Sequence, residues 1–137
     1  MINSTNPIVQ TVNAGDNVVF SLDRIRTKSC RCNGWLIHDN GSTLFTITKP
    51  GVYQISYNAD ITSAAPGVAS LALRVNGEPI VGSKSTYTVA TADAYGNVSA
   101  SVLISVPCSG NATIALVNSS TLDLSVQEPN ISFIKFA

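Results

Sequence analysis

The sequence predicts an all-β protein, folded as one antiparallel sandwich of two sheets with about ten strands. Residues 51–61 alternate apolar and polar side chains with a strict period of two, which is the pattern of a strand with one buried face. No window of about 11 residues or more carries the 3.6-residue period of an amphipathic helix. Short apolar runs are instead separated by Gly, Pro and Asn turns, and the length of 137 residues suits a single domain spanning residues 1–137.

The N-terminal half is expected to supply four of the strands. Each is a short run of mainly β-branched and aromatic residues bounded by turn residues, and the runs are residues 8–12, 17–22, 43–48 and 51–61. Residues 1–7 precede the first run and are expected to form a flexible or assembly-docking arm. Residues 23–33 are the most charged part of the chain and are expected to form a loop. The short apolar run 35–38 follows and leads into a hairpin turn.

The C-terminal half is expected to supply six more strands. These are residues 68–75, 83–92, 98–106, 112–117, 121–126 and 131–136. Asn76-Gly77 is the strongest turn signal, because both central positions of a tight hairpin turn require positive φ. Pro129-Asn130 is expected to turn the chain between the last two strands.

The last strand has apolar side chains on both faces. Ile131 and Phe133 point to one side, while Ile134 and Phe136 point to the other. A strand in a two-sheet sandwich buries one face in the core and exposes the other to water. Because exposed aromatic patches are uncommon on soluble monomers, this pattern predicts that a second subunit covers the outer face.

Composition and charge exclude several classes of partner. Charged residues make up 12% of the chain, and the net charge at pH 7 is zero. Without a basic run or stripe, no nucleic-acid partner is expected. No segment approaches the roughly 20 apolar residues of a membrane-spanning helix, so no membrane partner is expected. The N-terminus has no basic segment followed by an apolar core, so we expect synthesis in a cytoplasm rather than secretion through a signal peptide.

The sequence lacks the side-chain groupings on which catalysis and metal binding usually depend. His38 is the one histidine, no nucleophile-elbow motif accompanies it, and no acidic run has the spacing of a calcium loop. We therefore expect no enzymatic activity, no cofactor and no metal. Cys30, Cys32 and Cys108 leave three alternatives open: free thiols, a disulfide from Cys108 to one of the other two, or a zinc site with His38.

Two features are candidates for contact with a ligand or partner. Trp35 is either a plug in the core or an aromatic surface on which a sugar stacks. Arg24, Arg26 and Arg31 lie in the charged stretch, which is either a solvated loop or a patch for an anionic ligand or a neighbouring protein.

The strand at the centre of the chain also resembles a known family. Residues 50–59, Pro-Gly-Val-Tyr-Gln-Ile-Ser-Tyr-Asn-Ala, are similar to the third-strand signature of the complement 1q / tumour-necrosis-factor-like (TNF-like) jelly rolls. Residues 43–47 before it and residues 71–77 after it, with their Asn-Gly end, fit the family's order. The alternating residues 98–106 and the closing residues 131–136 follow in that order too. The resemblance covers most of the chain and implies a ten-strand jelly roll that assembles as a compact threefold trimer.

The resemblance further implies which residues lie at the subunit contacts. In such trimers the polar face of the third strand lies toward the threefold axis, which places Gln54, Ser56 and Asn58 near the centre. Leu103, together with Phe133 or Phe136 of the last strand, is expected nearby.

The likeness is to the bacterial and phage branch of the family, such as the C-terminal domain of the Bacillus collagen-like spore glycoprotein and phage head-fibre or decoration proteins. No collagen repeat is present, and the polar axis departs from the cytokine branch. The expected function is a non-enzymatic homotrimeric structural protein on the virion surface of a bacteriophage: a head fibre, a capsid decoration or a receptor-binding module. Alternatives are an adhesive trimer on a bacterial cell or spore surface, and a glycan-binding or glycan-active protein. The expected partners are other virion or surface proteins and a host surface glycan.

Overall fold

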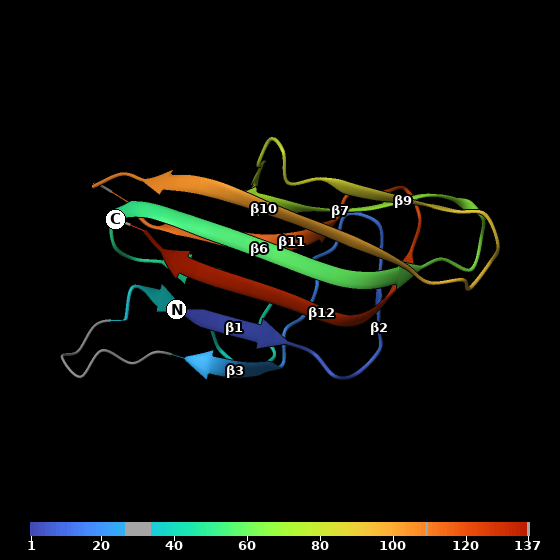
Figure 1. The fold of residues 1–137 in the computed structure, drawn as a ribbon, viewed down its shortest axis with the longest axis horizontal. Helices are drawn as coiled ribbons and strands as arrows, with labels where there is room; N and C mark the ends of the chain where they lie inside the picture. The colour runs from blue at the N-terminus through green and yellow to red at the C-terminus, as the bar shows by residue number, and fades with distance from the viewer. Residues whose placement is uncertain (27–33, 109, 137) are drawn as a thin grey trace.

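The computed structural model describes residues 1–26, 34–108 and 110–136, which form two antiparallel sheets packed face to face (Figure 1). The strands of these residues are β1 (Ile2–Thr5), β2 (Gln10–Val12), β3 (Leu22–Arg26), β4 (Leu36–Ile37), β5 (Phe45–Ile47), β6 (Gly51–Thr62), β7 (Gly67–Val75), β8 (Glu78–Pro79), β9 (Ser85–Val89), β10 (Gly96–Val106), β11 (Ala112–Asn118) and β12 (Leu124–Lys135). The prediction of an all-β sandwich is confirmed.

The two sheets mix strands from distant parts of the chain. One, here called the β6 sheet, has the order β10-β6-β12-β1-β3, with β2 also paired to β12. The other, the β7 sheet, has the order β4-β5-β11-β7-β8, with β9 also paired to β7. Figure 1 shows the β6 sheet in front of β7, β9 and β11. Because most neighbouring strands are not consecutive, the chain crosses repeatedly between the sheets, as it does in a jelly roll.

Strand β6 is the longest predicted alternation, and it lies inside its sheet, between β10 and β12. Its residues Tyr53, Ile55, Tyr57, Ala59 and Ile61 are each at most 3% exposed, so the predicted apolar face is the core face. Leu71, Leu73 and Leu116 of the β7 sheet belong to the same buried cluster. The polar residues of β6 therefore point away from the core.

Tyr57 gives the core a dependence on alkaline pH. Its hydroxyl donates to the carbonyl oxygens of Leu71 and Ser83, at 3.0 and 2.5 Å, and burial raises its pKa from 10.0 to about 12. Because the phenol ionises at lower pH in the unfolded chain, stability present below pH 10 is lost as the pH rises toward about 12. Replacing Tyr57 with Phe should cost about 1–3 kcal/mol at neutral pH and flatten this alkaline loss. Urea unfolding across that range measures both effects. The exposed Tyr95, replaced with Phe, is the control, and an unchanged alkaline slope in Tyr57→Phe would contradict the account.

The Asn76-Gly77 turn is where the sequence places it. Asn76 has φ 51° and Gly77 has φ 84°, as a two-residue hairpin turn with both φ values positive requires. The turn joins β7 to β8, and the Asn76 side chain accepts a hydrogen bond from the backbone N–H of Thr113 at 2.9 Å.

The N-terminal residues are not an arm. Strand β1 pairs with β12 on one side and with β3 on the other, and Ile2 and Ser4 are 3% and 0% exposed. The expectation that residues 1–7 form an arm was wrong. Asn, Ser and Thr dominate this strand, so its alternation of buried and partly exposed side chains does not appear in the sequence as an alternation of apolar and polar residues. Pairing on both sides satisfies its backbone without much apolar burial.

The next segment is also displaced from its predicted place. Residues 17–22 were expected to form a strand, but Asn17 makes only an isolated bridge with Val117, and β3 begins at Leu22. The charged stretch therefore starts inside a strand rather than in a loop, at least as far as Arg26. Strand β3 is at the end of the β6 sheet, where charged side chains are readily tolerated. Residues 27–33 lie outside the described residues.

The last two predicted strands are a single strand with an irregularity. Strand β12 runs from Leu124 to Lys135, and its register against β6 shifts between Gln127 and Asn130. Glu128 has φ 46°, and Pro129, which has no N–H to donate, occupies the bulge. The expected turn at Pro129-Asn130 is therefore a β-bulge within one strand.

Candidate functional site

The outer face of the β6 sheet is the candidate functional site, and we call it the interface face. Direct cross-strand pairing arranges its residues in three rows. These are Leu103–Gln54–Ile134, Ser101–Ser56–Ser132–Asn3 and Ser99–Asn58–Asn130–Thr5. Since paired residues in an antiparallel sheet share a face, all three rows point away from the core. No charged residue lies in any of the rows.

A network of neutral hydrogen bonds holds the middle of the interface face. Gln54 donates to Ser101 at 2.9 Å, and Ser101 shares a 2.9 Å hydroxyl contact with Ser56. On the other side of β6, the Asn3 amide donates to the side-chain oxygens of Ser132 and Asn130 at 3.0 and 2.9 Å. These groups already have partners within one protomer, so covering them with another subunit costs less than burying unpaired polar groups.

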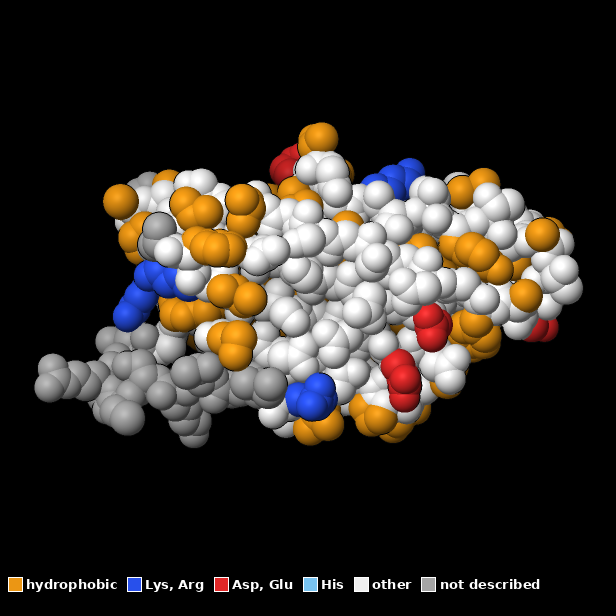
Figure 2. Space-filling view, in the orientation of Figure 1, with side chains coloured by type: hydrophobic (Ala, Val, Ile, Leu, Met, Phe, Trp, Pro, Cys, Tyr) orange, Lys and Arg blue, Asp and Glu red, His pale blue; other side chains and the backbone are white. Residues whose placement is uncertain are grey.

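One end of the interface face is apolar. Leu103 and Phe136 are 63% and 62% exposed, and Ile134 is 39% exposed. Phe136 follows β12, and its backbone N–H donates to the Val52 carbonyl oxygen at 2.8 Å, so its ring lies at the same end as Leu103 and Ile134. Figure 2 shows hydrophobic side chains gathered at this end, near the C-terminus, and an uncharged middle.

The structure brings most of the predicted interface residues together. Gln54, Ser56, Asn58 and Leu103 share the interface face, and Phe136 lies at its apolar end. Phe133 does not belong with them, because it is 0% exposed and its ring lies 4.7 Å from that of Phe45 in the core. The alternation of the last strand already separates Phe133 from Ile134 and Phe136, so Phe133 is corrected from an interface residue to a core residue.

Sequence reasoning missed six polar residues of the interface face, which are Asn3, Thr5, Ser99, Ser101, Asn130 and Ser132. Ser101, Ser132, Asn3 and Asn130 come from three strands and meet Ser56 or one another only through pairing. In residues 98–106 the even positions are apolar, so Ser101, at an odd position, is expected to point away from the core. Its place beside Ser56 follows once β10 is known to pair with β6. Asn3 gave no such signal, because its strand was not predicted.

The arginine cluster is only partly described. Arg24 is exposed on β3 and lines a hollow of about 470 Å³ together with Glu128 and Asn58. An anion entering this hollow would meet the Glu128 carboxylate, which argues against an anion site there. Arg26 belongs to β3, and Arg31 lies outside the described residues.

Trp35 is half-buried and uses its ring inside the protomer. The ring centroid lies 4.9 Å from that of Tyr53, and Trp35 packs against the core cluster. This contact favours the core plug over a sugar-stacking surface. Trp35 precedes β4 in the β7 sheet whereas Arg24 is on β3 in the β6 sheet, so the structure does not combine them into one site.

His38 holds the two sheets together rather than facing solvent. It is 2% exposed, its Nδ1 lies 2.8 Å from Asp23 Oδ1, and its Nε2 lies 3.0 Å from the Ser42 carbonyl oxygen. Its ring also stacks on Phe45, with centroids 4.0 Å apart. Both ring nitrogens have acceptor partners, which leaves this side chain poorly placed to act as a general base.

The remaining sequence candidates give no further site among the described residues. Cys108 is exposed and not in a disulfide, whereas Cys30 and Cys32 lie outside the described residues. Within residues 1–26, 34–108 and 110–136, no three His, Cys, Asp or Glu side chains are grouped to hold a metal ion. The same part of the chain contains no helix long and apolar enough to cross a membrane.

The strand order gives this chain the jelly-roll fold that is also seen in complement 1q and TNF structures. Similar solved structures include the globular domain of zebrafish complement 1qA, with a TM-score of 0.68 and 13% identity over 99% of this chain and 96% of that one. Eiger TNF from S. frugiperda has a TM-score of 0.70 and 9% identity over 99% and 92% of the two chains. The vertex protein P5 of phage PRD1 has a TM-score of 0.58 and 14% identity over 99% and 96%. No protein-family model and no curated protein matches the sequence.

Proposed function

We propose that the protein is a non-enzymatic, homotrimeric structural module on the surface of a bacteriophage particle. The observation that carries the proposal is the interface face, which is uncharged in its middle, internally hydrogen-bonded and apolar at one end. Leu103, Ile134 and Phe136 form an exposed apolar cluster of the kind that a soluble protein usually covers with a partner. The family resemblance implies that this partner is two further copies of the same chain.

The location on a virion is supported by the likeness to a phage vertex protein, a likeness of fold. A trimer at that location would present three copies of each loop on the β7 sheet side, and weak contacts with a host surface would then add through avidity. Within this proposal, head fibre, capsid decoration and receptor-binding module differ only in what the loops contact.

Assembly is tested by native mass spectrometry of the full chain at micromolar concentration. The expected mass is three times the chain mass of 14.3 kDa. A species of one chain mass would remove the trimer and, with it, the avidity argument.

The location is tested by antibody labelling of purified phage particles and of the host cells that produce them. Label at regular positions on the particles is expected. Label confined to bacterial cell or spore surfaces would contradict the virion role and support the adhesive trimer instead.

A further inference from the structure

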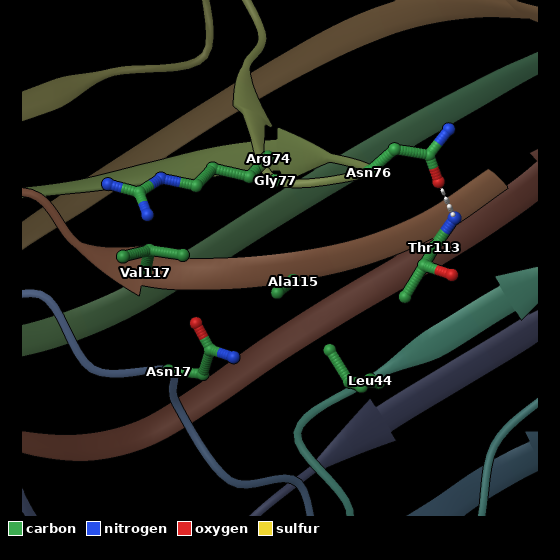
Figure 3. A pocket seen from close by; sticks show the side chains of 8 residues that line it. All are labelled: Asn17, Leu44, Arg74, Asn76, Gly77, Thr113, Ala115 and Val117. Atoms are coloured by element: carbon green, nitrogen blue, oxygen red, sulfur yellow. Dashed lines mark hydrogen bonds between the residues drawn. The ribbon is translucent and has the colours of Figure 1, made fainter.

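The outer face of the β7 sheet contains a hollow that lies away from the proposed subunit contacts. It measures about 290 Å³ and lies over β11 and β7, on the opposite side of the sandwich from the interface face. Ala115 and Val117 point away from the core, because they alternate with the core residue Leu116, yet they are only 7% and 1% exposed. Ala115 and Val117 therefore form the base of the hollow, and Figure 3 shows the other lining side chains around them.

The hollow carries one positive charge and no negative charge. Arg74 is paired directly with Ala115 across the β7–β11 ladder, which places its side chain beside the floor. Arg74 forms no ion pair with any residue that the structure describes. Among the residues that the structure describes, none that lines the hollow is Asp or Glu. A partly enclosed guanidinium without a carboxylate partner attracts a planar oxyanion, to which it can donate two parallel hydrogen bonds.

Neutral polar groups complete the lining. The backbone N–H of Thr113 donates to the Asn76 side-chain oxygen at 2.9 Å, which fixes the Asn76 amide with its NH₂ group turned away from Ala115, as Figure 3 shows. Asn17 is held next to Val117 by its backbone bridge and presents a second amide. Leu44 adds an apolar wall. Figure 3 shows these side chains arranged around Ala115.

We propose that this hollow binds a single carboxylated sugar, as found at the end of an acidic glycan. The carboxylate would be bound by Arg74, a hydroxyl would meet the Asn17 amide, and the C–H face of the ring would lie over Ala115 and against Leu44. A volume of about 290 Å³ is at the lower limit of small-molecule pockets, which suits one sugar ring and is too small for a folded peptide. All residues that line the hollow come from one protomer, so binding at this site does not require the trimer.

The test is a titration of the ¹⁵N-labelled full chain with D-glucuronate, D-glucose and acetate, followed by NMR. Glucuronate should give saturable shifts of backbone amides in β7 and β11, with at least about tenfold weaker binding of glucose and of acetate. Equal binding of acetate would mean that only an anion is recognised, and equal binding of glucose would mean that Arg74 contributes nothing. Either result, or no saturable shift, overturns the proposal.

Two substitutions and a control locate the site. Arg74→Gln should weaken glucuronate binding about tenfold or more while leaving the weak glucose binding unchanged. Ala115→Leu should fill the hollow and abolish binding of both sugars. Arg24→Gln removes an exposed arginine on the other sheet and should leave glucuronate binding unchanged. Well-dispersed spectra verify that each variant is folded. Unaltered glucuronate affinity in both Arg74→Gln and Ala115→Leu would exclude this hollow as the site.

Discussion

Replacing Leu103 with aspartate should convert the proposed trimer into monomers without unfolding the protomer. Leu103 is 63% exposed in a single chain, so the substitution removes little from the core. In the assembled state the same position would lie in the apolar end of a subunit contact. An aspartate side chain is too short to reach water from there, and a buried carboxylate without a partner costs several kcal/mol. Since about 2.8 kcal/mol is a factor of ~100 in a binding constant, assembly should fail at micromolar concentration.

The measurement is sedimentation velocity together with native mass spectrometry, and circular dichroism verifies the strand content. Val81→Asp is the matched control, because Val81 is 98% exposed in the segment between β8 and β9 and lies away from the interface face. The control should remain trimeric. A Leu103→Asp protein that sediments like the wild-type trimer would show that the interface face is not the contact surface.

Phe136 provides a graded version of the same experiment. Its ring is 62% exposed in the protomer, and truncation to alanine introduces no charge. We expect Phe136→Ala to weaken the trimer without abolishing it, so that dissociation appears on dilution. The difference between the two variants separates loss of apolar contact from burial of charge.

The sequence alone predicts the long strands well because their burial is one-sided. Strand β6 is recognisable because every second residue is apolar, and the parity of its polar residues correctly places Gln54, Ser56 and Asn58 on one outer face. Strand β1 is not recognisable in this way, since backbone pairing with β12 and β3 stabilises it and its side chains are mainly polar. Local composition cannot report a partner strand that is more than a hundred residues away in the chain.

The same reason limits prediction of the sites. The hollow around Arg74 needs β7, β11 and the Asn17 bridge side by side, and these segments are separated in sequence. In the sequence, Arg74 looks like any other polar residue on the exposed face of an alternating strand, so nothing there indicates a binding site. Similarly, Phe133 and Phe136 look alike as aromatic residues of the last strand, and only the direction of each side chain shows that one is core and the other surface.

The second large effect is expected at His38, whose replacement by alanine should destabilise the protomer by about 3–5 kcal/mol. The substitution leaves the Asp23 carboxylate, whose side chain is only 9% exposed, without its partner. It also leaves the Ser42 carbonyl oxygen without the ring nitrogen 3.0 Å away, and removes the ring stacked on Phe45. Asp23 is in the β6 sheet, whereas Phe45 is in the β7 sheet, so the lost contacts join the two layers.

A graded series distinguishes the ion pair from the packing of the ring. Asp23→Asn keeps an acceptor for the His38 Nδ1–H but loses the charge, and should cost about 1–2 kcal/mol, because neutral hydrogen bonds are roughly half as strong as charge-assisted ones. Asp39→Asn, at an exposed carboxylate on the adjoining turn, should change stability by less than about 0.5 kcal/mol. Urea unfolding in the monomeric Leu103→Asp background avoids the concentration dependence of a trimer. If His38→Ala were no less stable than Asp39→Asn, the contact of His38 with Asp23 and Phe45 would not stabilise the protomer. A catalytic role for His38 would then have to be tested.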